Sequence, residues 1–241
     1  MHQRLNAIVL GTVRHSDRVS IIHLYTDTHG RMAAVIPAGG SSRSSRMRRA
    51  AAMPLSVIEG EINFRPDREL QTLGRYALAR PNNGIYGNPA KSAVALFIAE
   101  FLSNTLREAL PDPLLWHFLD TSVRELDATP AAANFHIAFL SRMTAYAGIT
   151  PDTGDYTPHA RFDMREGRYT DYAPPHADVL AGEEARMPLL LSKINYMNCR
   201  RLRISADTRR RLLAGLIRYW AIHIPGADRL NSTEILRQVF A

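Results

Sequence analysis

The chain has 241 residues, of which 46% are hydrophobic and 22% charged, the balance of a protein that buries a core in one or two domains. It contains no uninterrupted apolar run long enough to span a bilayer, and its start lacks the apolar segment of a signal peptide, so we expect a cytoplasmic protein. Cys199 is the only cysteine, which excludes an internal disulfide and a zinc site built from several thiolates.

The net charge of +7 is concentrated in one part of the chain. Residues 1–80 carry 12 arginines against 6 acidic residues, a net charge of +6, whereas residues 81–241 contribute only +1. The stretch 28–58 has no acidic residue, and its basic residues are Arg31, Arg43, Arg46, Arg48 and Arg49. Such a positive field favours a polyanion through counterion release and steering, although a solvated surface that only aids solubility would carry the same charge.

The first third of the chain has the pattern of short strands separated by turns. Runs of branched and aromatic residues predict strands at about 3–13, 19–26, 31–37, 54–64 and 69–79. His29-Gly30 is a natural tight turn, and the long connection 39–46, rich in Gly, Ser and Arg, is too polar to be a strand. Five strands with one long connection predict the partly open barrel of the OB-fold, and an SH3-like barrel would use similar strands.

Helices are predicted for most of the remaining chain, so the fold class is α+β. Asn88 as a cap, with Pro89 as the first helical residue, starts a helix that we expect to reach about Leu110. Further helices are expected at about 113–126, 131–148, 183–197, 206–223 and 232–240, the last of them capped by Ser232 and Thr233. An irregular insert rich in Pro and Gly at about 149–182 contains a predicted hairpin at 161–169. We therefore expect an OB-fold domain at 1–80 and a helical domain at 81–241.

Motifs for catalysis are absent from the sequence. It has no Gly-x-x-x-x-Gly-Lys-Ser/Thr phosphate loop, no His-Glu-x-x-His and no Gly-x-Ser-x-Gly. The nine histidines are scattered without metal-ligand spacing, and Glu183-Glu184 fits the first turn of a helix better than a catalytic pair. We expect neither an enzyme nor a metal site nor a cofactor.

Arginine and serine make up nearly all of the segment 43–49, which the strand pattern places on a loop of the barrel. Arginine bridges phosphate oxygens with two donors and stacks on bases, so this segment suits a groove that follows a nucleic-acid backbone. The predicted DNA-binding residues are Arg31, Arg43, Arg46, Arg48, Arg49, Arg65 and Arg68. Tyr25 and Phe64 are candidates for base stacking, although an aromatic residue in a barrel strand more often belongs to the core.

A second basic cluster lies near the start of the helix expected at 206–223. It consists of Arg200, Arg201, Arg203, Arg209, Arg210 and Arg211, with Asp207 among them. Cations in the first turn of a helix oppose its dipole, so we interpret the cluster as an extension of the DNA path or a site for an acidic peptide, with Leu202 or Leu212 beside it. Exposed cations on a helix surface would give the same pattern.

The order and spacing of several segments resemble the RecO family of bacterial recombination mediators, in its Bacteroides-type branch. The resemblance covers nearly the whole chain. Its landmarks are the segments 7–17, 24–31, 54–55, 64–70, 89–100, 134–136, 162–167, 223–226 and 232–236. Many members of this family carry a cysteine zinc site in the insert; this chain has no cysteine there, so the hairpin at 161–169 is expected to rely on packing and hydrogen bonds.

The resemblance implies an N-terminal OB domain and a helical C-terminal domain that bind single- and double-stranded DNA and anneal complementary strands. It implies as partners the acidic C-terminal tail of the single-strand-binding protein, RecR, the recombinase RecA and possibly RecF, in repair of DNA damage near the nucleoid. On this view Arg43, Arg46, Arg48 and Arg49 neutralise phosphates on two strands, so annealing needs no ATP. The alternatives are an OB-fold RNA-binding protein, an enzyme that uses the proline-rich insert, and an adaptor whose arginines contact only proteins.

Overall fold

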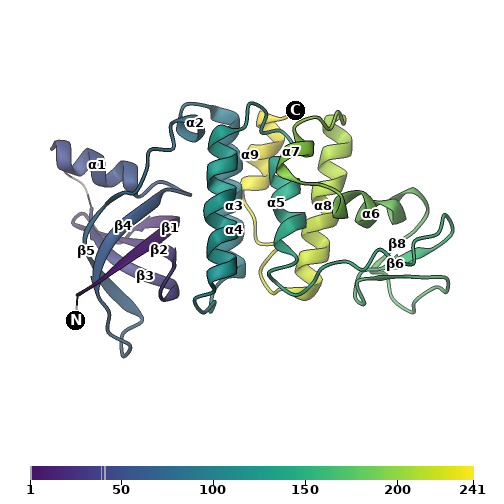
Figure 1. Cartoon of the computed structure of the whole chain (residues 1–241), viewed down its shortest axis with the longest axis horizontal. Helices are drawn as coiled ribbons and strands as arrows, with labels where there is room; N and C mark the ends of the chain where they lie inside the picture. Colours follow the sequence, from purple (N-terminus) through teal and green to yellow (C-terminus); the bar gives the residue numbers. More distant parts are fainter. Residues whose placement is uncertain (1, 39, 41) are drawn as a thin grey trace. The chain divides into compact units, whose positions relative to one another are not determined.

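The computed structural model describes residues 2–38, 40 and 42–241. The chain forms two compact units, Met1–Ala128 and Thr129–Ala241. The first unit contains a β-barrel followed by helices, and the second contains further helices and a small sheet (Figure 1).

Five strands close into the barrel of the first unit. They are β1 (His2–Arg14), β2 (Val19–Thr26), β3 (Gly30–Pro37), β4 (Val57–Asn63) and β5 (Leu70–Leu78). The order around the barrel is β1-β2-β3-β5-β4, with β1 antiparallel to both β2 and β4 and with β3 parallel to β5. This five-stranded closed barrel confirms the predicted OB-fold and the positions of its strands.

The barrel core follows from the alternation of side chains along each strand. In β3 every second residue is buried, and the inward side chains Met32, Ala34 and Ile36 face those of β2, Ile22 and Leu24. The inward positions of β1, β4 and β5 add apolar side chains to the same cluster. Some outward positions are buried as well, among them Ile8, Leu10 and Tyr25, because other parts of the first unit cover that face of the barrel.

The turn between β2 and β3 depends on Gly30. Its φ is +65°, a left-handed conformation that L side chains rarely adopt. A Cβ atom there would also lie 2.3 Å from the carbonyl oxygen of Ala109, in the segment that follows α3. The predicted turn at His29-Gly30 is therefore fixed both by backbone conformation and by close approach of a second chain segment.

The connection between β3 and β4 differs from the expected loop, because it contains a helix, α1 (Arg43–Ala51). Ser42 caps it by accepting a hydrogen bond from the Ser45 amide. Ser45 and Ala51 are buried, whereas most of the intervening side chains are exposed. The prediction of a flexible loop was wrong because a serine cap and one buried face suffice to order this polar stretch.

Three helices complete the first unit: α2 (Asn83–Tyr86), α3 (Pro89–Thr105) and α4 (Pro113–Ala128). The predicted cap of α3 is confirmed, since the Asn88 side chain accepts from the amides of Ala90 and Lys91 and Pro89 is the first helical residue. The helix ends at Thr105, earlier than expected.

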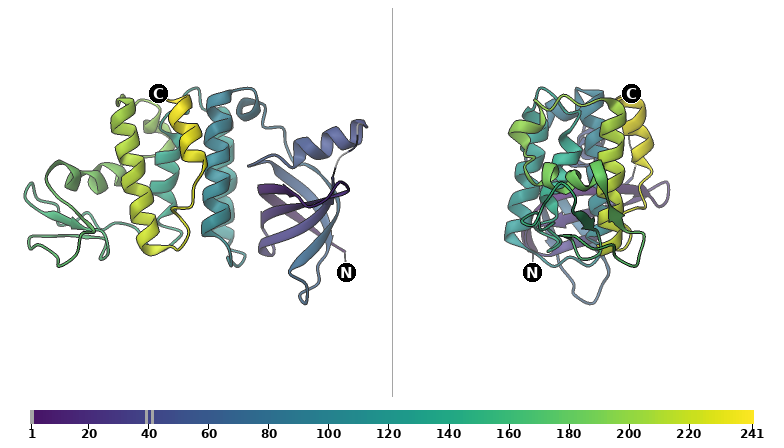
Figure 2. Two further views of the ribbon diagram at one scale, coloured as in Figure 1. Left: turned by 180° about the vertical axis from the view of Figure 1, so that it is seen from behind. Right: turned by 90° about the vertical axis from the view of Figure 1, so that its right-hand side faces the viewer.

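The helices of the second unit are α5 (Phe135–Met143), α6 (Met187–Ser192), α7 (Tyr196–Cys199), α8 (Ala206–His223) and α9 (Ser232–Val239). Helices α5 and α8 lie side by side (Figures 1 and 2). The indole of the fully buried Trp220 donates to the carbonyl of Leu140 across this contact, at 3.2 Å. The predicted cap of α9 by Ser232 and Thr233 was wrong, because the cap position is Asn231, whose side chain makes no capping hydrogen bond to the helix.

The insert forms a three-stranded sheet from β6 (Arg161–Asp163), β7 (Arg168–Thr170) and β8 (Val179–Leu180), in the order β7-β6-β8. The β6–β7 pair confirms the predicted hairpin. Its buried side chains, among them Phe162 and Tyr169, pack with Tyr219 of α8. A 3₁₀ turn (Gly182–Arg186) then leads into α6, so the single helix expected at 183–197 is broken into three short ones.

Within the described ranges, no helix has both the length and the apolar character needed to cross a membrane.

Candidate nucleic-acid interface

Helix α1 presents four arginines, which we call the α1 cluster: Arg43, Arg46, Arg48 and Arg49. Arg43, Arg46 and Arg49 are exposed and Arg48 is half-buried. The Nη2 of Arg48 donates to Ser45 Oγ at 3.1 Å, and the Nη1 of Arg49 donates to the Gly40 carbonyl at 2.7 Å. Both acceptors are neutral, so these contacts orient the guanidinium groups without cancelling their charge.

A second basic site, the turn cluster, consists of Arg65 and Arg68 between β4 and β5. Both side chains are exposed at the corners of a turn in which the Arg68 amide donates to the Arg65 carbonyl at 3.1 Å. They line a shallow hollow of about 310 Å³ together with Asn63, Leu70 and Thr72. Asp67 and Glu69 lie in the same turn and reduce its net charge.

The two clusters lie at opposite ends of the barrel (Figure 1). Strand β4 starts at Val57, soon after α1, and ends at Asn63, where the turn begins. The seven residues of β4, at a rise of ~3.3 Å per residue, span about 20 Å between these two ends of the barrel. The sequence predicted these arginines as one set of DNA-binding residues, whereas the topology divides them between two ends of the barrel.

Arg31 does not belong to either patch. Its Nη2 donates to Ser103 Oγ of α3 at 3.3 Å and its Nη1 donates to the Met32 carbonyl. Burial, and secondarily the positive charge of Arg107, lower the pKa of Arg31 to about 10, so it stays charged at neutral pH. Its position on β3 points it towards α3 and sets it apart from the exposed arginines, and its assignment to DNA binding stays a prediction.

The two aromatic candidates for base stacking are both engaged inside the protein. Tyr25 is fully buried, and its hydroxyl oxygen donates to the Leu110 carbonyl and accepts from the Asp112 amide. Phe64 is partly buried against the barrel core and stacks on His29, with ring centroids 4.0 Å apart. The stacking role of Tyr25 is therefore excluded in this conformation, and one face of Phe64 is already covered.

Two further exposed arginines, which the sequence did not single out, lie at the β1–β2 turn. Arg14 is exposed and pairs with Asp17 at 2.6 Å, and Arg18 is exposed where its carbonyl accepts from the Ala38 amide, close to the segment that enters α1. Their position in a predicted turn could have indicated that both side chains are exposed. Asp17, which lies between them in the sequence, made the turn look less basic.

The second basic cluster divides into three parts. Arg200, Arg201 and Arg203 are exposed in the connection between α7 and α8. Arg210 and Arg211 each lie 3.3 Å from a carboxylate oxygen of Asp207. Such exposed ion pairs contribute little to stability but reduce the field available to a partner.

Arg209 has an internal role. Its Nε donates to Asn134 Oδ1 at 3.0 Å, its Nη1 donates to the Phe240 carbonyl at 3.3 Å, and its guanidinium lies 5.8 Å from the centre of the Phe240 ring. It links α8 to the start of α5 and to the end of α9. These contacts occupy several of its donors within the fold, and the assignment of Arg209 to partner binding stays a prediction.

A hollow of about 450 Å³ lies beside the exposed part of this cluster. It is lined by Asn134, Cys199, Arg200, Leu202, Arg203, Ile204 and Arg209, among others. Leu202 is exposed at this hollow, whereas Leu212 is half-buried on α8. Of the two apolar neighbours suggested by the sequence, only Leu202 faces it.

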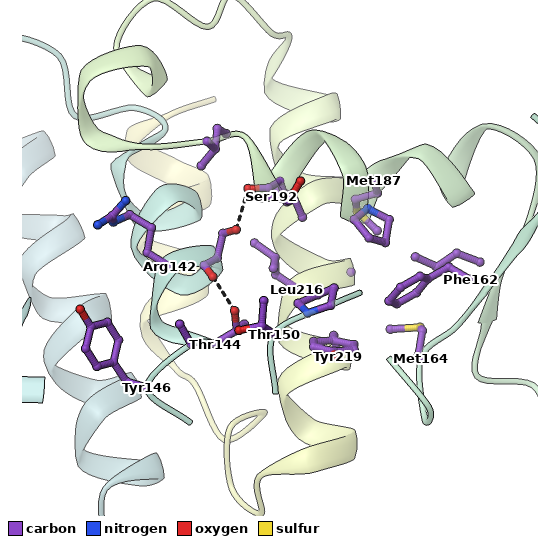
Figure 3. Close-up of a pocket in the computed structure, with 18 residues that line it drawn as sticks. Arg142, Thr144, Tyr146, Thr150, Phe162, Met164, Met187, Ser192, Leu216 and Tyr219 are labelled. Atoms are coloured by element: carbon purple, nitrogen blue, oxygen red, sulfur yellow. Dashed lines mark hydrogen bonds between the residues drawn. The ribbon is translucent and has the colours of Figure 1, made fainter. Parts of the chain in front are cut away.

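A more apolar pocket of about 290 Å³ lies among α5, α6, α8 and the insert sheet. Phe162 and Met164 of the insert lie at one end and Arg142 and Tyr146 at the other, with Tyr219 between them (Figure 3). The sequence did not indicate this pocket, because its walls come from four segments that are far apart in the chain.

The residues that the structure describes contain no group of three His, Cys, Asp or Glu side chains that could hold a metal ion. In the insert, the buried Asp163 instead accepts from the amides of Arg165 and Glu166, and lies 3.3 Å from His176. Asp178 joins Arg165 to Arg218 of α8 at 2.8 and 2.9 Å. Hydrogen bonds and ion pairs thus stabilise the hairpin.

Comparison with known proteins identifies the family. The chain matches two family models, the N-terminal domain of recombination protein O over residues 1–82 and its C-terminal domain over residues 87–234. It is 33% identical to the DNA repair protein RecO of Phocaeicola vulgatus and 31% identical to that of Bacteroides fragilis, and each alignment covers 100% of both chains. The protein of the same name from Azobacteroides pseudotrichonymphae is 27% identical over 100% of both chains. The chain therefore belongs to the RecO family of DNA repair and recombination proteins.

Proposed function

We propose that this protein binds single- and double-stranded DNA through the α1 cluster and anneals complementary strands during recombinational repair. One observation carries the proposal: a helix on an OB barrel holds four arginines, the described contacts of Arg48 and Arg49 are to neutral oxygens, and no acidic residue lies on α1. OB barrels bind nucleic-acid strands with basic grooves and loops. The turn cluster at the other end of the barrel provides a second point of attachment.

Annealing by this surface needs only electrostatics. Two complementary strands repel each other through their phosphates, and a patch of four cations lowers that repulsion where the strands meet. Guanidinium groups also bind phosphate oxygens bidentately, which orients each backbone. No bond is broken and no nucleotide is hydrolysed in this scheme.

The test is the salt dependence of DNA binding. Each phosphate contact contributes about 0.7 to 0.9 to the slope of log affinity against log salt, so changing Arg43, Arg46, Arg48 and Arg49 to Ala should flatten the slope by about three units. Fluorescence anisotropy with a labelled single strand at several salt concentrations measures it. An unchanged slope would rule out the α1 cluster as the DNA site.

A matched control removes the same amount of charge elsewhere. The control variant replaces four exposed arginines that pair with acidic residues, Arg124, Arg165, Arg168 and Arg237, by Ala. We expect it to keep the wild-type slope. If both variants flatten the slope equally, binding reflects net charge and not a defined surface.

We further propose that the helical unit docks the acidic tail of the single-strand-binding protein at Arg200, Arg201 and Arg203, with Leu202 contacting its apolar end. This docking would bring the barrel to coated DNA, where RecR, RecA and, in some systems, RecF act. Changing the three arginines to Glu should abolish annealing of strands coated with that protein and leave annealing of bare strands unchanged. Loss on both substrates would contradict this assignment.

The same assays separate the rival interpretation as an RNA-binding protein. We expect single-stranded DNA to compete for the α1 cluster at least as well as RNA of the same length.

The domain division at residue 80 and a location in the cytoplasm, near the nucleoid, remain predictions. The division is supported by the two family models, which meet between residues 82 and 87.

A further inference from the structure

Gln71 occupies an unusual position for a polar residue. It follows the first residue of β5, and its side chain points inward with only 4% of its surface exposed. The next inward position of β5 is Leu73, which belongs to the apolar core of the barrel. Burying an amide there costs free energy unless its donors and acceptor find partners, so an apolar residue would be the ordinary choice.

The partners of Gln71 all lie in the turn between β4 and β5. Its Oε1 accepts from the Arg65 amide at 3.0 Å, and its Nε2 donates to the Arg65 carbonyl at 2.8 Å and to the Arg68 carbonyl. The turn itself is closed by the bond from the Arg68 amide to the Arg65 carbonyl, with Pro66 at its second position. One buried side chain thus fixes the backbone on both sides of the turn.

The residues whose backbone Gln71 fixes are the two arginines of the turn cluster. Their side chains remain exposed, and both line the shallow hollow at this end of the barrel. A turn held in one conformation loses less conformational entropy when its side chains bind a ligand. The geometry therefore separates two tasks, with the buried amide fixing the backbone and the guanidinium groups left to bind.

We propose that Gln71 is a positioning residue of the DNA-binding surface, which holds Arg65 and Arg68 in place for phosphates at the end of the barrel opposite α1. This inference rests on the proposed function, because it concerns how a second DNA contact is built. It assigns no contact with DNA to Gln71 itself.

The first measurement needs no DNA. Replacing Gln71 by Leu removes all three hydrogen bonds and leaves an apolar side chain beside Leu73. We expect hydrogen exchange of the Arg65 amide to accelerate at least tenfold, while amides in the middle of β1 and β2 keep their protection. Exchange at Arg65 that equals the wild-type rate would overturn the proposal.

The second measurement is a double-mutant cycle on the affinity for single-stranded DNA. In the wild-type background Gln71→Leu should weaken binding about fivefold and flatten the salt slope towards that of the Arg65→Ala/Arg68→Ala variant. In the background of that variant, Gln71→Leu should change the affinity less than twofold. Equal losses in both backgrounds would show that Gln71 serves the barrel as a whole and would overturn the proposal.

Two further variants keep the result interpretable. Ile62→Val, in the barrel core, is expected to lower the midpoint of unfolding without touching the turn, so its salt slope should match the wild type. Gln71→Met preserves side-chain length and replaces Gln71→Leu if the latter does not fold. The Arg65→Ala/Arg68→Ala variant could leave the salt slope unchanged while the α1 variant flattens it. In that case the turn cluster takes no part in binding. This inference then fails, and the proposed function of the α1 cluster is unaffected.

Discussion

The α1 cluster and the cluster at 200–211 have similar sequences and different structural roles. Both are runs of arginine with few acidic neighbours, and both start a helix with a serine cap, Ser42 in one case and Ser205 in the other. In α1 the described partners of Arg48 and Arg49 are neutral oxygens of the same segment. At the start of α8, Arg209 binds two other parts of the fold, and Arg210 and Arg211 share Asp207.

The difference follows from what surrounds each helix. Helix α1 lies on the barrel with one buried face formed by small side chains, Ser45 and Ala51, so its arginines point to solvent. Helix α8 lies in a helical unit, where the amide of Asn134 and the carbonyl of Phe240 are within reach of its first turn. A run of arginine therefore stays available to a ligand where its side chains remain exposed and its contacts within the fold are to neutral oxygens.

The largest effect that tests this contrast is expected at Arg209. Arg209→Ala should lower the free energy of unfolding by about 3 kcal/mol, because it leaves buried acceptors without their charged donor. Urea denaturation measures the loss. Arg211→Ala, at an exposed ion pair, should change stability by less than about 0.5 kcal/mol, and equal losses in the two variants would erase the distinction drawn between them.

The charge of Arg209 also lowers the pKa of a histidine in the same unit, His136. Burial, and secondarily Arg209, lower the pKa of His136 on α5 to about 3, and its ring stacks near Phe240 with centroids 6.1 Å apart. Because the folded-state pKa lies below the unfolded value of 6.5, this contribution to stability is complete above pH 6.5 and is lost as the pH falls towards 3.

We expect the protein to lose about 2 kcal/mol of stability between pH 7 and pH 5 from this histidine alone. His136→Gln removes the titrating group. The stability of this variant should therefore fall less steeply between pH 7 and pH 5 than that of the wild type, even if the substitution lowers stability by a constant amount at every pH. Unfolding curves of both proteins at several pH values give the difference. Parallel pH profiles would mean that His136 is protonated in the folded protein.

Much of this fold could be predicted from local patterns. The barrel strands, the cap of α3 by Asn88 and Pro89, and the hairpin of the insert all depend on alternation, caps and turns that lie within a few residues of one another. Helix α1 was missed because its composition is that of a loop, and its order depends on burial of Ser45 and Ala51 against the barrel.

The candidate site was less predictable, because its geometry depends on long-range contacts. Tyr25 and Arg31 lie on strands whose outward faces are covered by chain from α3 to Pro113, and no local pattern reveals that cover. The separation of the two basic patches follows from the direction of β4, and the role of Arg209 follows from Asn134, 75 residues away. Sequence identified the basic residues, and tertiary structure decided which of them remain available.

The smallest effect concerns the cap that keeps the α1 cluster helical. Ser42 Oγ accepts from the Ser45 amide and lies 2.9 Å from Ser45 Oγ, which in turn accepts from Arg48. Ser42→Ala should cost the helix about 1 kcal/mol, whereas Ser42→Gly should cost only a few tenths. Because α1 is short and mostly exposed, this loss should appear as faster hydrogen exchange in α1, with little change in the unfolding of the barrel.

A loosened α1 should weaken DNA binding by no more than about fivefold, since 1 kcal/mol corresponds to that factor. The order of affinities expected is wild type, then Ser42→Gly, then Ser42→Ala. If Ser42→Ala exchanges like the wild type, α1 is held by the packing of Ser45 and Ala51 alone. If it exchanges faster and binds DNA as tightly, the arginines act as a diffuse charge, and the contrast with the ordered arginine of α8 becomes sharper.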